Sequence, residues 1–243
     1  MPHARGLAWG VLALCPLLNG QEAGDPAVAK NVSTSAKPPR QDRRIFWIIP
    51  NYRTTPASAH YEPLSAKEKF KLATTDAFDP GTFALGALFG AESQLSHANP
   101  SFGQGATGFA RYFATSYADY AIGDYMTEAI YPVLLRQDPR FFRKGAGSGW
   151  SRLCYAVGQI FWTYTDRGRH QVNFSELLGN ATSVAISNAY YPDTRDARDA
   201  TAKWGTQIGV DMASNVLKEF WPDIRRKVFH KRDDADTIPG PGH

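Results

Sequence analysis

The fold of this chain is decided by residues 101–136, which read SFGQGATGFARYFATSYADYAIGDYMTEAIYPVLLR. This is the longest helix-compatible run in the sequence, and it is rich in Ala, Phe, Tyr, Ile and Leu. It nevertheless includes Arg111, Asp119, Asp124 and Glu128. Charged groups on an apolar helix need partners or water, because burying them alone costs several kcal/mol. The segment is therefore either the polar centre of a helical bundle or a functional site, and the sequence leaves both alternatives open.

The flanking segments contain helix start signals in series. Ser65 with Glu68 forms a capping-box pattern, and Asp79 before Pro80 is a second start signal. Further signals lie at Ser148, at Asn173 with Glu176, and at Asp193 with Asp196. The expected helices end near Thr75, Leu95, Tyr131, Tyr164, Tyr190 and Phe220. No useful strand alternation follows residue 53, so we expect an all-α fold, a single-domain bundle of about six helices.

Proline residues supply the signals that are expected to end or kink the helices. Pro132 is expected to kink or end the central helix, Pro192 to end the next long helix, and Trp221 with Pro222 to break the last one.

Residues 43–53, RRIFWIIPNYR, contain a short run of apolar residues. We expect this segment to be a short strand or an extended arm laid against the helices.

The N-terminal residues have the composition of an exported protein. His3 and Arg5 precede an apolar run at residues 7–18 that is shorter than a membrane-spanning helix. The expected divisions are a signal peptide at 1–20, a flexible linker at 21–44, a helical domain at 45–231 and a disordered tail at 232–243. We therefore expect export to the periplasm or cell envelope.

The net charge of the chain limits the classes of partner that it is expected to bind. The formal net charge is +4 and the sequence pI is about 9.0 over 243 residues. An exported protein with this mild excess is expected to meet an anionic lipid surface or an envelope polymer, and not nucleic acid. The sequence contains no dinucleotide or phosphate-binding fingerprint, and its histidines form no HExxH or ExxH pattern. No cofactor and no metal site are predicted.

Three helices place small residues four apart, a spacing that lets neighbouring backbones approach closely. These sets are Gly86 and Gly90; Ala181, Ala185 and Ala189; and Gly205, Gly209 and Ala213. We expect each set to form a helix-packing seam.

The expected helices also contain polar residues within their apolar pattern. Besides Glu92, these are Asp119, Asp124, Glu128, Asn180, Asn188, Asp211 and Asn215. One hypothesis is a shared interior network in which they satisfy one another. The alternative is that most of them face water. Because Asp124 and Glu128 are four apart, they share a helix face, as paired carboxylates do in acid/base sites.

Glu92 belongs to a sharper local pattern. Glu92 and Ser93 end an apolar helix, a polar loop follows, and Gly105–Gly108 (GATG) starts the next helix. The pattern resembles the Glu-Ser and Gly-Ala-x-Gly signature of lytic transglycosylases, which implies a catalytic Glu92 acting as general acid and base on peptidoglycan. It departs from the family at Phe109, Ala110 and Arg111, where Met and Gln are usual. A carboxyl group in an apolar pocket would have the raised pKa that such chemistry needs.

Two basic segments combine cations with aromatic or aliphatic groups, a composition suited to an anionic lipid surface. The residues concerned are Arg140, Arg143, Lys144, Arg225, Arg226, Lys227, Lys231 and Arg232. Solvated helix ends are the alternative, since cations are favoured at helix C-termini.

Stretches along the chain, including QDPRFFRKG, FSELLGN and ISNAYYP, are similar to an uncharacterised group of exported bacterial proteins of unknown function. That resemblance implies no activity and no site residues. The leading hypothesis is an exported cell-envelope protein with a structural or interaction role, and association with the membrane is a further hypothesis. The alternative is a peptidoglycan-cleaving enzyme that uses Glu92.

Overall fold

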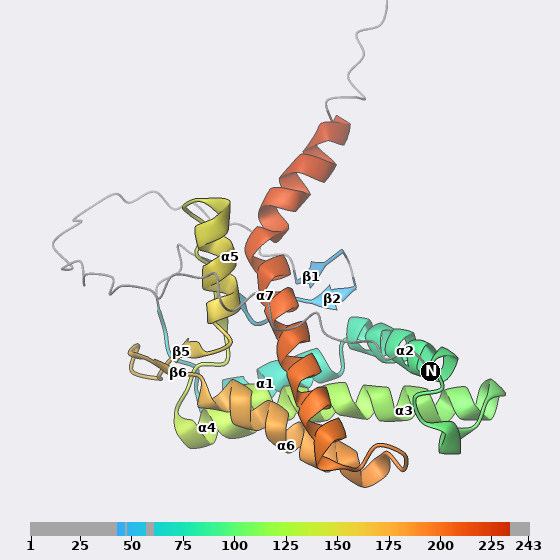
Figure 1. Ribbon diagram of the computed structural model, residues 1–243. Helices are drawn as coiled ribbons and strands as arrows, with labels where there is room; N and C mark the ends of the chain where they lie inside the picture. The colour runs from blue at the N-terminus through green and yellow to red at the C-terminus, as the bar shows by residue number, and fades with distance from the viewer. Residues whose placement is uncertain (1–42, 47, 57–60, 234–243) are drawn as a thin grey trace, which may run out of the picture. The chain divides into compact units, whose positions relative to one another are not determined.

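The all-α prediction is confirmed by the computed structural model, which describes residues 43–46, 48–56 and 61–233 (Figure 1). The helices are α1 (Ala66–Ala77), α2 (Pro80–Leu95), α3 (Gly105–Asp124), α4 (Tyr131–Leu135), α5 (Gly149–Gly158), α6 (Phe174–Tyr190) and α7 (Ala197–Asp233). A π-helical turn, Tyr125–Ile130, joins α3 to α4 without a break. If these three are counted as one helix, the described residues contain six helical segments, as expected.

Local capping chemistry starts the helices where the sequence predicts. Ser65 and Glu68 form a complete capping box at α1, and the side chain of Asp79 accepts a hydrogen bond from Gly81 N at the start of α2. Ser148 and Asn173 cap α5 and α6 in the same way. Each cap satisfies a backbone N–H that has no partner within its own helix.

Neither Pro132, expected to kink or end its helix, nor Pro222, expected to break the last one, ends a helix. Pro132 lies in the first turn of α4, where the missing N–H is tolerated because the preceding π turn has already shifted the hydrogen-bond register. Pro222 lies inside α7. Arg152 of α5 braces that turn by donating from Nη2 to the backbone oxygen of Glu219 at 2.8 Å. A local π turn thus carries the first helix past its proline, and a tertiary contact supports the second.

Short strands join the helices at three places. Strands β1 (Arg44–Ile45) and β2 (Ile49–Pro50) are antiparallel, as are β5 (Trp162–Tyr164) and β6 (His170–Val172), whereas β3 (Thr54–Thr55) and β4 (Phe141–Phe142) are parallel. The helix expected to reach Tyr164 thus ends at Gly158, and a hairpin follows. The arm before α1 is strand-like, one of the two expected forms.

The structure describes only part of the segments into which the sequence was divided. The signal peptide at 1–20, the linker as far as residue 42 and the tail from residue 234 lie outside the described residues. Arg44, assigned to the linker, belongs to β1 and forms an ion pair with Asp79 at 2.7 Å. Helix α7 extends to Asp233, two residues into the predicted tail.

The small-residue seams are correct on α2 and wrong on α6 and α7. Gly86 and Gly90 face the backbone of α3 at Tyr117 and Phe113. The Ala181, Ala185 and Ala189 set is exposed, and so is the Gly205, Gly209 and Ala213 set. On α6 the close approach occurs instead at Gly179, where a Cβ would lie 2.8 Å from Thr127 Cγ2.

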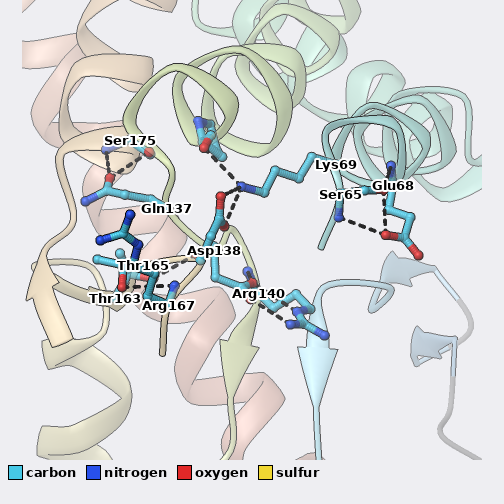
Figure 2. Close-up of polar contacts among 12 residues, drawn as sticks. Ser65, Glu68, Lys69, Gln137, Asp138, Arg140, Thr163, Thr165, Arg167 and Ser175 are labelled. Atoms are coloured by element: carbon cyan, nitrogen blue, oxygen red, sulfur yellow. Dashed lines mark hydrogen bonds and ion pairs between the residues drawn. The ribbon is translucent and has the colours of Figure 1, made fainter. Parts of the chain in front are cut away.

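A polar junction ties α1 and α6 to the β5–β6 hairpin (Figure 2). Lys69 of α1, almost fully buried, donates to Asp166 at 2.7 Å and to the backbone oxygen of Pro132 at 3.1 Å. Gln137 Oε1 accepts hydrogen bonds from the backbone N and the hydroxyl of Ser175, each at 2.7 Å. These bonds fix the start of α6 against the end of α4.

We predict that Gly90→Ala destabilises the protein, because the added Cβ would lie 2.9 Å from the Cα and N atoms of Phe113 and push α2 off α3. The expected loss is about 1–3 kcal/mol in the free energy of unfolding measured with urea. Gly209→Ala is the matched control, since nothing lies within 4 Å of its Cβ. It should gain up to about 1 kcal/mol from helix propensity. Equal effects of the two substitutions would contradict the assignment of the α2 seam.

Candidate functional site

A cavity of about 450 Å³ is lined by residues of α2, α3, the π turn, α6 and α7, together with Arg53 from the segment before β3. Apolar groups, including Phe89, Tyr120 and Val210, form part of its wall. Hydroxyl and amide side chains form much of the rest, and four acidic residues also line the cavity, namely Asp119, Asp124, Asp199 and Asp211. The cavity is therefore amphiphilic and rich in acidic groups.

Arg53 links the arm to the bundle at this cavity. Its Nη1 lies 3.3 Å from Glu128 Oε1 of the π turn, and its Nη2 lies 3.3 Å from Glu176 Oε2 of α6. Its Nε donates to the backbone oxygen of Pro139 at 3.1 Å. Burial opposes the charge of the guanidinium, but Glu128 and Glu176 outweigh it and raise the pKa of Arg53. Arg53 is therefore a fixed cation.

Acidic groups around Arg53 outnumber the cations. Besides Glu128 and Glu176, the cluster contains Asp76 of α1, Asp124 of α3 and Asp211 of α7, with Lys218 as the second cation. Burial, followed by the charge of Asp76, raises the pKa values of Asp124 and Glu128 well above their usual range. We name these residues, with Arg53, the buried charge cluster; Arg53, Asp124 and Asp211 are its partly buried members, and they line the cavity.

Two pairs within the buried charge cluster favour retained protons. Asp76 Oδ1 and Glu128 Oε2 are buried and accept no hydrogen bond from any described group, and each carboxyl group perturbs the pKa of the other. A proton held between them would satisfy both oxygens. In the second pair, burial and then Glu176 raise the pKa of Asp211 to about 8. Asn180 Nδ2 donates to Asp211 Oδ2 at 3.0 Å and lies 3.5 Å from Glu176 Oε1.

Tyr191, Lys203 and Asp119 form another part of the cavity wall. The hydroxyls of Tyr190 and Tyr191 both donate to the carboxylate of Asp119, the second at 2.7 Å. Lys203 Nζ lies 3.8 Å from the centre of the Tyr191 ring. Burial lowers the pKa of Lys203, and the charge of Asp119 opposes that shift. This wall already contains its own cation.

The structure brings together several of the predicted polar core residues. Asp124, Glu128, Asn180 and Asp211 meet at Arg53, and Asp119 lies in another part of the same cavity wall. Asn188 and Asn215 are partly buried but do not line the cavity, and no described residue forms a hydrogen bond with Asn188 Oδ1.

Sequence reasoning missed Arg53, Asp76, Glu176 and Lys218. Glu176 was explained by its capping position at the start of α6, so its contact with Arg53 was not expected. Arg53 lies in the arm before α1, and the residues it contacts are distant in sequence. One signal was available in the sequence. Asp76 lies three residues before the capping residue Asp79, so two acidic residues occur close together at the junction of two helices.

Glu92 is placed outside the site. Its side chain is exposed on α2, although its neighbour Ser93 lines the cavity. The enclosed apolar pocket that the transglycosylase resemblance implies for a general acid does not surround Glu92.

The first basic segment, one of the two candidate lipid surfaces, is largely engaged in contacts within the protein. Arg140 forms an ion pair with Asp138 at 2.6 Å, and Lys144 Nζ donates to Ser151 at 2.7 Å. Arg143 is partly buried, and burial lowers its pKa. These side chains are used to join β4 to its neighbours.

The second basic segment lies along the C-terminal part of α7. Arg226 pairs with Asp223 at 2.5 Å, and Arg225 and Lys227 are exposed. Lys231 and Arg232 fall within the helix, but their side chains lie outside the described part of the chain. Within that part, no cluster of metal-ligating side chains occurs, and none of the helices combines the length and apolarity of a membrane span.

We predict that Arg53→Met costs about 3–5 kcal/mol of stability, because Glu128 and Glu176 are left buried without their cation. Thermal or urea unfolding measures the loss. Adding Glu128→Gln should restore part of it, since one uncompensated charge is removed. Arg226→Met is the control: its pair with Asp223 is exposed, and such pairs contribute about 0–1 kcal/mol. If Arg53→Met is as mild as this control, the cluster does not hold the arm.

Stability should fall as pH rises, because the folded protein binds protons more tightly than the unfolded chain at its raised carboxyl groups. For Asp211 the contribution is fully present below the unfolded pKa, about 4, and is lost as pH rises to the folded value of about 8. Asp211→Asn should reduce this slope in urea unfolding measured across that range. The exposed Glu92→Gln should keep the wild-type slope. A stability that rises over the same range would refute the assignment.

Comparison with known proteins supplies no family for this chain. No protein-family description matches it, and neither the curated proteins nor the solved structures contain a significant match. Function is therefore argued from the cavity and from the buried charge cluster.

Proposed function

We propose that this protein is an exported helical component of the cell envelope that acts by binding, and that it holds a small amphiphilic ligand in the cavity between α2, α3, α6 and α7. The observation that carries the proposal is the cavity itself. Its volume of about 450 Å³ lies within the range of small-molecule sites, roughly 300–1,000 Å³.

The composition of the cavity wall supports an amphiphile. Phe89, Tyr120 and Val210 offer apolar contact, whereas Asp124 and Asp211 offer charge. Sites for small molecules combine such apolar walls with a few polar groups that fix orientation. A purely structural bundle gains nothing from an open space lined by carboxylates, because each of them costs desolvation energy.

The place in the cell is argued from the sequence. The apolar run at residues 7–18 behind a positive start has signal-peptide character, and the net charge of +4 suits an anionic envelope. Binding is the form of interaction that the described residues support best, since the Arg140 segment is occupied by internal contacts.

The binding proposal predicts that the neutral fluorescent probe N-phenyl-1-naphthylamine becomes brighter on adding the protein and saturates at one site. Val210→Trp should weaken probe binding at least about tenfold by filling the cavity wall. Val228→Trp is the matched control, because Val228 is an exposed valine on the same helix and does not line the cavity. Equal binding by both variants would place the probe elsewhere, and absent saturation would refute the proposed function.

A further inference from the structure

The cavity holds acidic groups that its own cations do not neutralise. Arg53 is committed to Glu128 and Glu176, at 3.3 Å each. Asp124 and Asp211 both line the cavity, and Asn180 Nδ2 donates a hydrogen bond to Asp211 Oδ2. Asp124 and Asp211 are thus acidic groups at this end of the cavity that form no ion pair with a cation among the described residues.

We propose that the ligand bears one aliphatic ammonium group, which lies between Asp124 and Asp211 while its apolar part packs against Phe89, Tyr120 and Val210. This inference rests on the proposed function and names the chemical class of the ligand. An ammonium is the complement of carboxylates in a space partly withdrawn from water.

Unpartnered polar atoms in the same wall point independently to a bound molecule. The side chain of Ser187 is 1% exposed and lines the cavity, and its Oγ makes no hydrogen bond of normal geometry with any described residue. Among the described residues, Gln207 Oε1 and Thr194 Oγ1 of the same wall are also buried without a hydrogen-bond partner. Buried polar atoms are normally satisfied, so these two hydroxyl groups and this amide oxygen suit polar groups supplied by a bound molecule.

Lys203 limits the ligand to a single positive charge. Its Nζ lies over the Tyr191 ring and interacts with Asp119 and Asp199, so the part of the cavity around Asp119 contains a cation of this chain. A second ligand ammonium there would face Lys203. A carboxylate or phosphate head near Asp124 would face Asp211, Glu176 and Asp76 instead. A monoamine therefore fits better than a diamine or an anion.

Binding of the ammonium exchanges a cation for a proton. At neutral pH the raised pKa of Asp211, about 8, keeps a proton on that carboxyl group. An incoming ammonium ion would pair with the carboxylate, and the displaced proton passes to the buffer. The groups that face Asp211 are Glu176 and Asn180 of α6, Arg53 of the arm, Asp124 of α3 and Lys218 of its own helix. Affinity should accordingly rise between pH about 6 and about 8.

The test is displacement of bound N-phenyl-1-naphthylamine by hexylamine, hexanol and hexanoate, which share one chain length and differ in charge. Hexylamine should compete at least about tenfold better than the other two at pH about 8. Asp124→Asn combined with Asp211→Asn should abolish that preference, whereas Glu92→Gln, an exposed acid outside the cavity, should retain it. If hexanol or hexanoate competes equally well, the ammonium inference is wrong while the binding proposal stands.

A calorimetric measurement on the unaltered protein keeps the inference testable if the double variant does not fold. Titration of hexylamine in buffers of different ionisation enthalpy should show net proton release at pH about 7. Binding without proton release would overturn the inference. Failure of the fluorescent probe itself to bind would instead overturn the proposed function, so the two failures are distinguishable.

Discussion

The structure depends on one buried cation, the guanidinium of Arg53. Its side chain is 18% exposed and contacts carboxylates from two segments that lie far apart in sequence, Glu128 and Glu176. A buried charge is tolerated only when partners and hydrogen bonds replace its lost hydration. The arm, the π turn and α6 must therefore be correctly placed together. Removing any one of them leaves a charge that water can no longer solvate.

The π turn is the local device that makes this meeting possible. It widens the helix at Tyr125–Ile130, the place where Gly179 of α6 lies close to Thr127. With α6 so near, Glu176 reaches the same guanidinium as Glu128. The extra residue in the turn also relieves the demand that Pro132 would make on a regular helix. The close approach of α6 to the π turn and the contacts of Arg53 with Glu128 and Glu176 therefore have one structural cause.

The sequence predicted features that depend on neighbouring residues and missed those that depend on distant ones. Capping by Ser65 and Asp79 is local, and both helices start as predicted. Passage of α7 through Pro222 depends on Arg152 of α5, which no local rule contains. Likewise, acidic residues in apolar helices indicated a polar interior. The cation that pairs with them, Arg53, lies in the arm that precedes the helices. The outward-facing Ala and Gly sets show that spacing alone does not say which face is buried.

An excess of buried acid is costly for a protein that needs only to fold. Replacing Asp124 or Asp211 with an uncharged residue would remove desolvation and mutual repulsion, the causes of their raised pKa values. Strongly perturbed groups that line a cavity are characteristic of functional sites, where stability is lost in exchange for binding or chemistry. The same carboxyl groups lie beside unpartnered polar atoms of the cavity wall. Retained protons relieve the charge cost in the folded protein, and a ligand cation could take the place of such a proton.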